Sequence, residues 1–195
     1  MYDLEEIVNR IYQTPSDINE HIPTFVEYGL ECETITEMGV RAISSTWAWL
    51  GSAPKRLISY DMENPSHYGA NINTVYEVAE QYGLNFEFIK ADVLAIEIEP
   101  TDLLFLDTWH AYDQLKAELE LHSPKVAKYI IMHDTTSYEY RDEPLTSENT
   151  FKGDKSAGKG LWPAITEFLD THPEWTLHKR YTNNNGITII KRVAW

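Results

Sequence analysis

The sequence predicts an α/β protein built on a Rossmann-like, doubly wound sheet of five parallel strands, with a C-terminal antiparallel hairpin and N-terminal flanking helices. From Thr34 onwards, short apolar runs alternate with longer amphipathic segments, a pattern typical of a parallel sheet covered on both faces. A strong turn signal joins the last two strand-like runs. A chain of 195 residues can be organised by one hydrophobic core, so we expect a single domain over residues 1–195.

Residues 1–30 are expected to form a helical flank. Leu4, Ile7 and Ile11 recur at helical spacing, and Ser16-Asp17 is placed to cap a second helix that carries Ile22. The strands are expected at Thr34–Met38, Arg56–Tyr60, Phe86–Ile89, Leu103–Leu106 and Tyr129–Met132. The helices among them are expected at Ile43–Leu50, Ile72–Tyr82 and Tyr112–Leu121.

The C-terminal third begins with a polar, glycine-bearing stretch over residues 135–160. It is too long for an ordinary connection, so we expect an active-site loop there. A helix over Leu161–Leu169 follows, and then two strands over Thr176–Tyr181 and Ile187–Lys191. The Asn-Asn-Asn-Gly run between these strands favours a tight hairpin.

Composition excludes several classes of partner. The formal net charge of −15 disfavours bulk nucleic acid and anionic lipid surfaces as partners. No apolar run approaches the roughly 20 residues that a membrane span needs. The single cysteine, Cys32, has no partner for an internal disulfide, and we expect a cytoplasmic protein.

Each of the five expected parallel strands carries an acidic residue at its carboxyl end or shortly beyond it. Ligands of open parallel sheets bind beyond the carboxyl ends of the strands, so these acids are candidates for a binding site. The alternative for any one of them is an N-cap of the following helix. The five strand ends read Glu37-Met38-Gly39, Asp61, Asp92, Asp107 and His133-Asp134.

From Thr34 to Arg192 the order of these motifs resembles the class I S-adenosylmethionine-dependent methyltransferases. It is most similar to the small O-methyltransferases related to catechol O-methyltransferase and to the cephalosporin-hydroxylase-like group. The resemblance implies S-adenosylmethionine as the cofactor and methylation of a hydroxyl group. It also implies that Glu37 and Gly39 open the cofactor turn, that Asp61 binds the ribose hydroxyls, and that Asp92 lies near the adenine.

The family's second glycine is absent after Gly39, where the chain reads Val-Arg-Ala-Ile-Ser-Ser-Thr. A hydroxyl such as that of Ser45 could bind the cofactor's carboxylate instead, and a simple helix start is the alternative.

The resemblance also implies a divalent metal held by Asp107 and Asp134, either Mg²⁺ or Mn²⁺. Thr135 stands where the family usually carries a third oxygen ligand, and its hydroxyl is the candidate replacement. The imidazole of His133 suits Mn²⁺ or Fe²⁺ better than Mg²⁺. His110, three residues after Asp107, is the expected general base of a catalytic pair with Asp107, because its pKa lies near neutral pH.

The acceptor is expected to be a small molecule with a hydroxyl group, such as a sugar or a phosphorylated compound. Lysines at 152, 155 and 159 form a basic patch that could attract an anionic acceptor, and Tyr138, Tyr140 and Trp162 could stack on a ring. The segment Gly153–Gly160 resembles a phosphate loop, but no strand precedes it and the hydroxyl residue is missing.

Three other functions stay open at this point. They are a metal-independent methyltransferase acting on another acceptor, a family member with oxidative chemistry, and a non-catalytic cofactor-binding or scaffold protein. A homodimer is also open, with the tryptophans at 47, 49 and 195 as candidates for its surface and burial in the core as the alternative.

Overall fold

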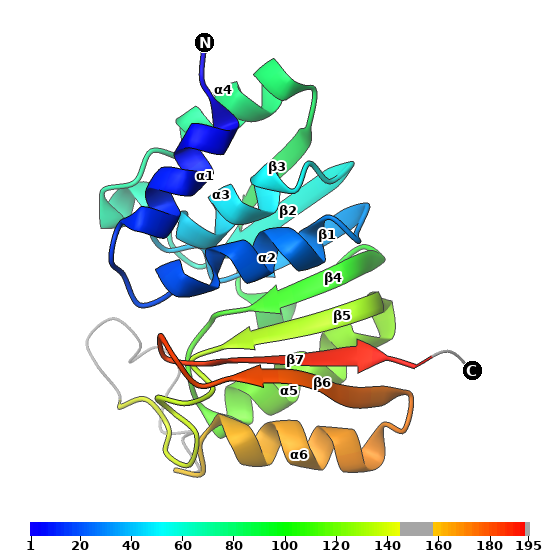
Figure 1. Ribbon diagram of the computed structural model, residues 1–195. Coiled ribbons are helices and arrows are strands. Elements are labelled where there is room, and N and C mark those ends of the chain that lie inside the picture. The colour runs from blue at the N-terminus through cyan, green and yellow to red at the C-terminus, as the bar shows by residue number, and fades with distance from the viewer. Residues whose placement is uncertain (145–157, 194–195) are drawn as a thin grey trace.

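The computed structural model describes residues 1–144 and 158–193, and its centre is a seven-stranded sheet (Figure 1). The strand order is β3-β2-β1-β4-β5-β7-β6. The first five strands pair in parallel, and β7 lies antiparallel between β5 and β6. This confirms the predicted fold class. The strands are β1 (Thr34–Met38), β2 (Arg56–Asp61), β3 (Asn85–Lys90), β4 (Thr101–Leu106), β5 (Val126–His133), β6 (Trp175–Tyr181) and β7 (Ile187–Arg192).

Helices cover both faces of the sheet, because alternate strand residues point to opposite sides. Leu103 and Phe105 pack with the four N-terminal helices, whereas Leu104 and Leu106 pack with the other two. The first group contains α1 (Leu4–Gln13), α2 (Ile22–Gly29), α3 (Ser44–Gly51) and α4 (Ile72–Tyr82). The second contains α5 (Tyr112–His122) and α6 (Leu161–Thr171). Short 3₁₀ turns span Asn19–His21, Pro65–Tyr68, Val93–Ala95 and Ser123–Lys125.

The predicted cap of the second helix is wrong. The α2 helix begins at Ile22 after a 3₁₀ turn, and its N-cap residue, His21, makes no side-chain capping bond. Pro23 occupies the first turn, where its missing N–H needs no acceptor, and this fixes the start of the helix. Ser16 and Asp17 instead lie in the link between α1 and α2, at the mouth of the cleft described below.

The tryptophan candidates for a dimer surface do not support one. Trp47 and Trp49 are buried in the core, which is the alternative that the sequence left open, and Trp195 lies outside the described residues. The middle of the expected active-site loop, residues 145–157, also lies outside them. None of the described helices has the length and apolar character needed to cross a membrane.

Candidate active site

A cleft of about 910 Å³ lies beyond the carboxyl ends of β1, β2, β4 and β5. Open parallel sheets bind their ligands at this edge. Segments far apart in the sequence form its walls: the link between α1 and α2, the turns after the strands, and the β6–β7 hairpin. The lining residues used below are Asp17, Gly39, Arg41, Ser45, Asp61, Glu63, Asp107, His110, Asp134, Tyr138, Glu143 and Asn185.

The turn after β1 forms one wall, and Gly39 makes it possible. Its φ is +88°, and a Cβ at this position would meet the carbonyl oxygen of Asp107 at 1.9 Å. Arg41 and Ile43 also have positive φ, of 42° and 60°. Non-glycine residues, and β-branched ones above all, rarely adopt this conformation. The turn therefore keeps left-handed backbone positions without the family's second glycine.

Asp61, at the end of β2, holds this turn. Its Oδ2 accepts hydrogen bonds from the backbone N–H groups of Val40 (2.8 Å) and Arg41 (2.9 Å), and its Oδ1 accepts one from Glu63 (2.8 Å). A carboxylate offers about four acceptor positions, so about one stays open toward the cleft. Asp61 therefore both supports the turn and lines the cleft, and its contact with a ribose stays a prediction.

Glu37 lies behind the cleft rather than in its lining. Its carboxylate is fully buried and accepts hydrogen bonds from the hydroxyls of Ser45 (2.6 Å), Thr46 (2.8 Å) and Ser59 (2.6 Å). Burial raises the pKa of Glu37 to about 7, although the three hydroxyl donors oppose the shift. The Ser45 hydroxyl is thus engaged with Glu37, and through this bond the two residues tie the start of α3 to β1.

Asp92 is not among the residues that line the cleft. It is exposed, and its carboxylate caps the 3₁₀ turn after β3 by accepting a hydrogen bond from the backbone N–H of Leu94 (3.0 Å). The structure therefore shows the capping role that the sequence left open for this acid. The adenine contact stays a prediction.

Four side chains from the ends of β4 and β5 form a compact cluster. His133 Nδ1 lies 3.1 Å from Asp107 Oδ1 and 3.1 Å from Asp134 Oδ2. His110 Nε2 lies 3.4 Å from the same Asp107 oxygen and 3.0 Å from the same Asp134 oxygen. Donor atoms of Asp107, His110 and Asp134 all lie within 4.8 Å of one another, close enough to share a metal ion.

The charges in this cluster stabilise one another. Burial alone would raise the pKa of Asp107 and of Asp134, but the two imidazoles lower both well below the usual range. Burial alone would lower the pKa of each histidine, yet the carboxylates raise the pKa of His110 and of His133 well above the usual value. In the ligand-free site, the two histidines therefore hold protons between the two carboxylates.

The chemistry of this cluster fits a divalent cation at Asp107 and Asp134. Asp134 is 5% exposed, and its Oδ1 has no hydrogen-bond partner among the described residues. Its backbone is left-handed, with φ of 58°, a conformation that is costly for a non-glycine residue. Thr135, in contrast, is fully buried outside the cleft lining, and its hydroxyl accepts a hydrogen bond from the Thr188 hydroxyl (2.9 Å).

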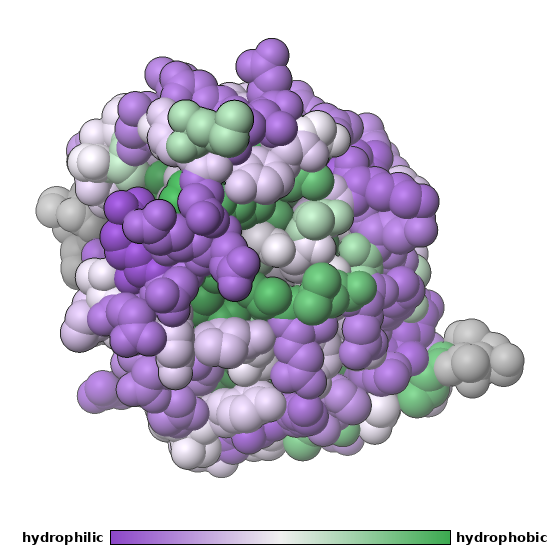
Figure 2. All heavy atoms as spheres, turned by 45° about the horizontal axis from the view of Figure 1, so that its top comes forward, coloured by the Kyte–Doolittle hydropathy of each residue, from purple (hydrophilic) through white to green (hydrophobic). Residues whose placement is uncertain are grey.

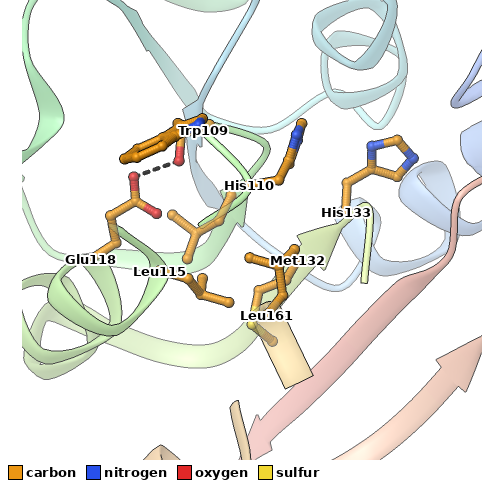
Figure 3. Close-up of a pocket in the computed structure, with 9 residues that line it drawn as sticks. Trp109, His110, Leu115, Glu118, Met132, His133 and Leu161 are labelled. Atoms are coloured by element: carbon orange, nitrogen blue, oxygen red, sulfur yellow. Dashed lines mark hydrogen bonds between the residues drawn. The ribbon is translucent and has the colours of Figure 1, made fainter. Parts of the chain in front are cut away.

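The loop that carries His110 is fixed by a hydrogen bond to α5. The Thr108 hydroxyl donates to the buried carboxylate of Glu118 (2.6 Å), which also accepts from Gln114 (2.6 Å). Figure 3 shows Glu118 on one side of a small cavity of about 10 Å³, with the rings of His110 and His133 on the other side. Such a cavity holds about one water molecule at most, so the cluster rests on a closely packed floor.

Sequence analysis did not identify two residues that contact the histidines of this cluster. Glu143 accepts a hydrogen bond from His110 Nδ1 (3.1 Å), and the main-chain carbonyl of Asp17 lies 3.2 Å from His133 Nε2. No strand-end motif marks either residue, because tertiary structure alone brings them here. Tyr138 was expected as a stacking residue, and it stacks on His110 with ring centroids 4.9 Å apart.

The other acceptor-binding candidates lie away from the cleft or outside the described residues. Tyr140 is 64% exposed and is not among the lining residues. Trp162 lies beneath the guanidinium of Arg180, 4.0 Å from ring centroid to Cζ. Lys159 lies over the ring of Tyr112, and the lysines at 152 and 155 are outside the described residues.

Solved structures of methyltransferases have the same fold. Magnesium protoporphyrin IX methyltransferase from Synechocystis PCC 6803, with bound SAH, matches with a TM-score of 0.61 and 15% identity over 94% of this chain and 91% of that one. The SAH-bound methyltransferase PaMTH1 from Podospora anserina matches with a TM-score of 0.57 and 15% identity over 100% and 89%. A Staphylococcus aureus protein described as a caffeoyl-CoA O-methyltransferase matches with a TM-score of 0.62 and 12% identity over 99% and 93%.

No curated protein sequence matches this chain. A family model does match it, over residues 2–193, and that model describes the rhamnosyl O-methyltransferase/CmcI family. The match spans nearly the whole chain, and it confirms the enzyme class that the strand-end motifs predicted, an S-adenosylmethionine-dependent methyltransferase. The chain therefore belongs to the rhamnosyl O-methyltransferase/CmcI family.

Proposed function

We propose that this enzyme methylates a hydroxyl group of a neutral small molecule, such as a sugar, with divalent-metal assistance. The observation that carries the proposal is that a single cleft contains both halves of the required chemistry. The Gly39 turn and Asp61 lie at one side, and the cluster of Asp107, His110 and Asp134 lies at the other. Bound S-adenosylmethionine supplies an electrophilic methyl group.

The residues of the β1–β2 side bind and orient the cofactor. The backbone at Gly39 permits close approach, and the open acceptor position on Asp61 suits a ribose hydroxyl. Glu37 and Ser45 act by holding the turn in shape, and the adenine contact proposed for Asp92 would require the cofactor to extend beyond the described cleft lining. Holding the nucleophile and the methyl carbon in line is the main task of such a site.

The cluster handles the proton of the acceptor hydroxyl. A divalent cation held by Asp107 and Asp134 would orient the acceptor oxygen and lower its pKa, whereas the Thr135 hydroxyl is engaged with Thr188 outside the cleft. His110 Nε2 faces this same point. A cation on the two carboxylates would displace the proton that they hold on His110, and the neutral ring would then take the hydroxyl proton as the new O–C bond forms and the S–C bond breaks. Glu143 orients the ring through Nδ1 and stabilises the imidazolium.

The charge of the cleft supports a neutral acceptor over an anionic one. Its described lining contains six carboxylates against one arginine and one histidine. Carboxylates repel a phosphorylated or carboxylated ligand unless a cation intervenes. Tyr138 offers a ring face for a sugar beside His110.

Cys32, a buried and single thiol, fits our proposal that the enzyme works in the reducing cytoplasm.

Calorimetry with S-adenosylmethionine is the first test. Wild-type protein is expected to bind it, and Asp61→Asn is expected to weaken binding by on the order of 10-fold to 100-fold, because it removes acceptor capacity from the turn. Asp3→Asn, at the cap of α1 outside the cleft, is the matched control and should bind normally. Labelled methyl transfer to a panel of sugars, phenols and amines then identifies the acceptor. Absence of cofactor binding would instead support a scaffold protein.

A further inference from the structure

We propose that His133 is a metal ligand of this site, and that the site selects a transition-metal ion such as Co²⁺, Mn²⁺ or Fe²⁺ over Mg²⁺. The proposal rests on the proposed function only in taking the cluster as part of the active site. The ligands are Asp107 Oδ1, Asp134 Oδ2 and His133 Nδ1, which leaves His110 as the proton acceptor.

The first observation is the geometry of the donors. His133 Nδ1 is 3.1 Å from each of the two carboxylate oxygens. A metal ion about 2.0 to 2.2 Å from nitrogen and oxygen ligands holds neighbouring donors roughly 3.0 to 3.5 Å apart. His133 Nδ1 is thus already spaced from both carboxylate oxygens for one ion. The Oδ1 of Asp134, which is buried and has no hydrogen-bond partner among the described residues, offers a further contact.

The second observation is the surroundings of the other ring nitrogen of His133. Its Nε2 lies 3.2 Å from the carbonyl oxygen of Asp17 and 3.3 Å from that of Asn184. Carbonyl oxygens only accept hydrogen bonds, so Nε2 carries a hydrogen, and Nδ1 is the nitrogen that would exchange its proton for a metal ion between the two carboxylates. Metal-binding histidines are oriented in this way by an acceptor on the opposite nitrogen.

Exposure separates the roles of the two histidines. The His133 side chain is 1% exposed and is equidistant from both carboxylates, as a fixed ligand requires. The His110 side chain is 19% exposed, lines the cleft and lies unequally at 3.0 and 3.4 Å from the carboxylates. An acceptor hydroxyl in the cleft can reach His110, whereas the hairpin and the α1–α2 link cover His133.

The nitrogen donor decides the preferred metal. Mg²⁺ binds oxygen ligands in near-octahedral geometry and gains little from imidazole. First-row transition metals bind imidazole well, and their affinity for mixed nitrogen and oxygen sites increases along the series from Mn²⁺ to Cu²⁺. We therefore expect the metal-free protein to bind Co²⁺ on the order of 100-fold more tightly than Mg²⁺.

The test titrates Co²⁺ and Mg²⁺ into chelator-treated full-length protein without cofactor or acceptor, so metal binding is measured independently of methyl transfer. His133→Gln is expected to lower Co²⁺ affinity by on the order of 10-fold to 100-fold and to change the visible Co²⁺ spectrum. His122→Gln is the matched control, since His122 is equally buried, is not among the cleft-lining residues and bonds the carbonyl of Val93 rather than a carboxylate of the cluster. It should leave both the affinity and the spectrum unchanged.

A second measurement guards against misfolding of the His133 variant. Mn²⁺ bound to wild-type protein should show a nitrogen coupling in pulsed electron paramagnetic resonance. That coupling should persist in His110→Gln and disappear in His133→Glu, which keeps a ligand but replaces nitrogen with oxygen. The inference is overturned if Co²⁺ binds no tighter than Mg²⁺, or if the coupling survives in His133→Glu. Cofactor binding that persists under those outcomes would leave the proposed function standing.

Discussion

At the scale of single residues, some side chains and backbone angles of the site are energetically unfavourable, and the surrounding packing keeps them in place. Among the described residues, Glu37 is a buried acid with no cationic hydrogen-bond partner, and Asp134 combines a left-handed backbone with a buried oxygen that has no hydrogen-bond partner. Each is costly for folding and is held by surrounding structure. Strain of this kind is typical of functional sites, where ligand binding compensates for it.

Glu37 should make the stability of the protein depend on pH. Burial raises its folded-state pKa from the usual 4.5 to about 7, so the fold favours the protonated acid. Its contribution to stability is fully present below pH 4.5 and is lost as the pH rises through 7, by up to about 3 kcal/mol. Glu37→Gln stays neutral, so its free energy of unfolding should fall less than that of wild type between pH 5 and pH 8.

Urea unfolding at several pH values measures this difference. Glu5→Gln, at an exposed position in the first turn of α1, is the control and should follow the wild-type curve. Parallel pH curves for wild type and Glu37→Gln would show that Glu37 does not carry the effect. The histidine cluster also titrates, but it is common to all three proteins and cancels in the comparison.

Replacing Gly39 by alanine should destabilise the protein more than replacing a glycine whose only constraint is a positive φ. Gly83 caps α4 with φ of +67°, and a Cβ at this position would meet no atom of the described residues within 4 Å, so Gly83→Ala is expected to cost about 1 kcal/mol. Gly39→Ala adds a collision with the Asp107 backbone and should cost about 3 kcal/mol or more. Thermal unfolding gives both costs, and calorimetry should show weaker cofactor binding in Gly39→Ala alone. Equal effects of the two variants would contradict the close approach of the β1 turn to β4.

At the scale of elements, each strand of the C-terminal hairpin carries an arginine that stacks on a tryptophan and donates a hydrogen bond to a main-chain carbonyl. At the cleft end, Arg180 lies over Trp162 and donates to the carbonyl of Thr135 (3.3 Å) and to Glu139 (2.7 Å). At the other end, Arg192 lies over Trp175 and donates to two main-chain carbonyls, at 2.8 and 2.9 Å. Only the first arginine holds the segment that follows β5.

Replacing each arginine by methionine should separate stability from function. Both variants keep the apolar stem and lose the hydrogen bonds, so each should cost about 1 to 3 kcal/mol. Arg180→Met should also speed amide hydrogen exchange over residues 135–143 and raise the KM for the acceptor, because Tyr138 and Glu143 in this segment line the cleft. Arg192→Met should do neither. The same exchange rate over that segment in both variants would show that Arg180 is not its anchor.

Sequence patterns predicted the elements well because local periodicity determines them. The expected α4 and β1 ranges are the observed ones, and the other strands differ by at most three residues at either end. The patterns were less informative where tertiary contacts decide. Nothing near Thr135 signals that its hydroxyl pairs with Thr188, and the approach of Glu143 to His110 depends on the fold of a loop. Strand-end acids could be listed from the sequence, but not the direction in which each carboxylate points.

At the scale of the whole molecule, charge favours cationic ligands. The net charge is −15, and the face in Figure 2 is largely hydrophilic, with apolar side chains in a band across its middle and in smaller scattered areas. The cleft adds its own excess of carboxylates. S-adenosylmethionine carries one net positive charge at neutral pH, whereas the product of methyl transfer is neutral overall. The field of the protein therefore favours the substrate form of the cofactor over the product form.

This difference should disappear as salt increases. Raising the ionic strength from about 0.01 M to about 1 M shortens the screening length from about 30 Å to about 3 Å. We expect the affinity for S-adenosylmethionine to fall by on the order of 10-fold over this range, and the affinity for S-adenosylhomocysteine by less than about 2-fold. Calorimetry of both ligands in the presence of a chelator gives the comparison, with the neutral product as the internal control. Parallel salt curves would mean that contacts to the sulfonium and ammonium groups, rather than the protein's overall field, decide between the two ligands.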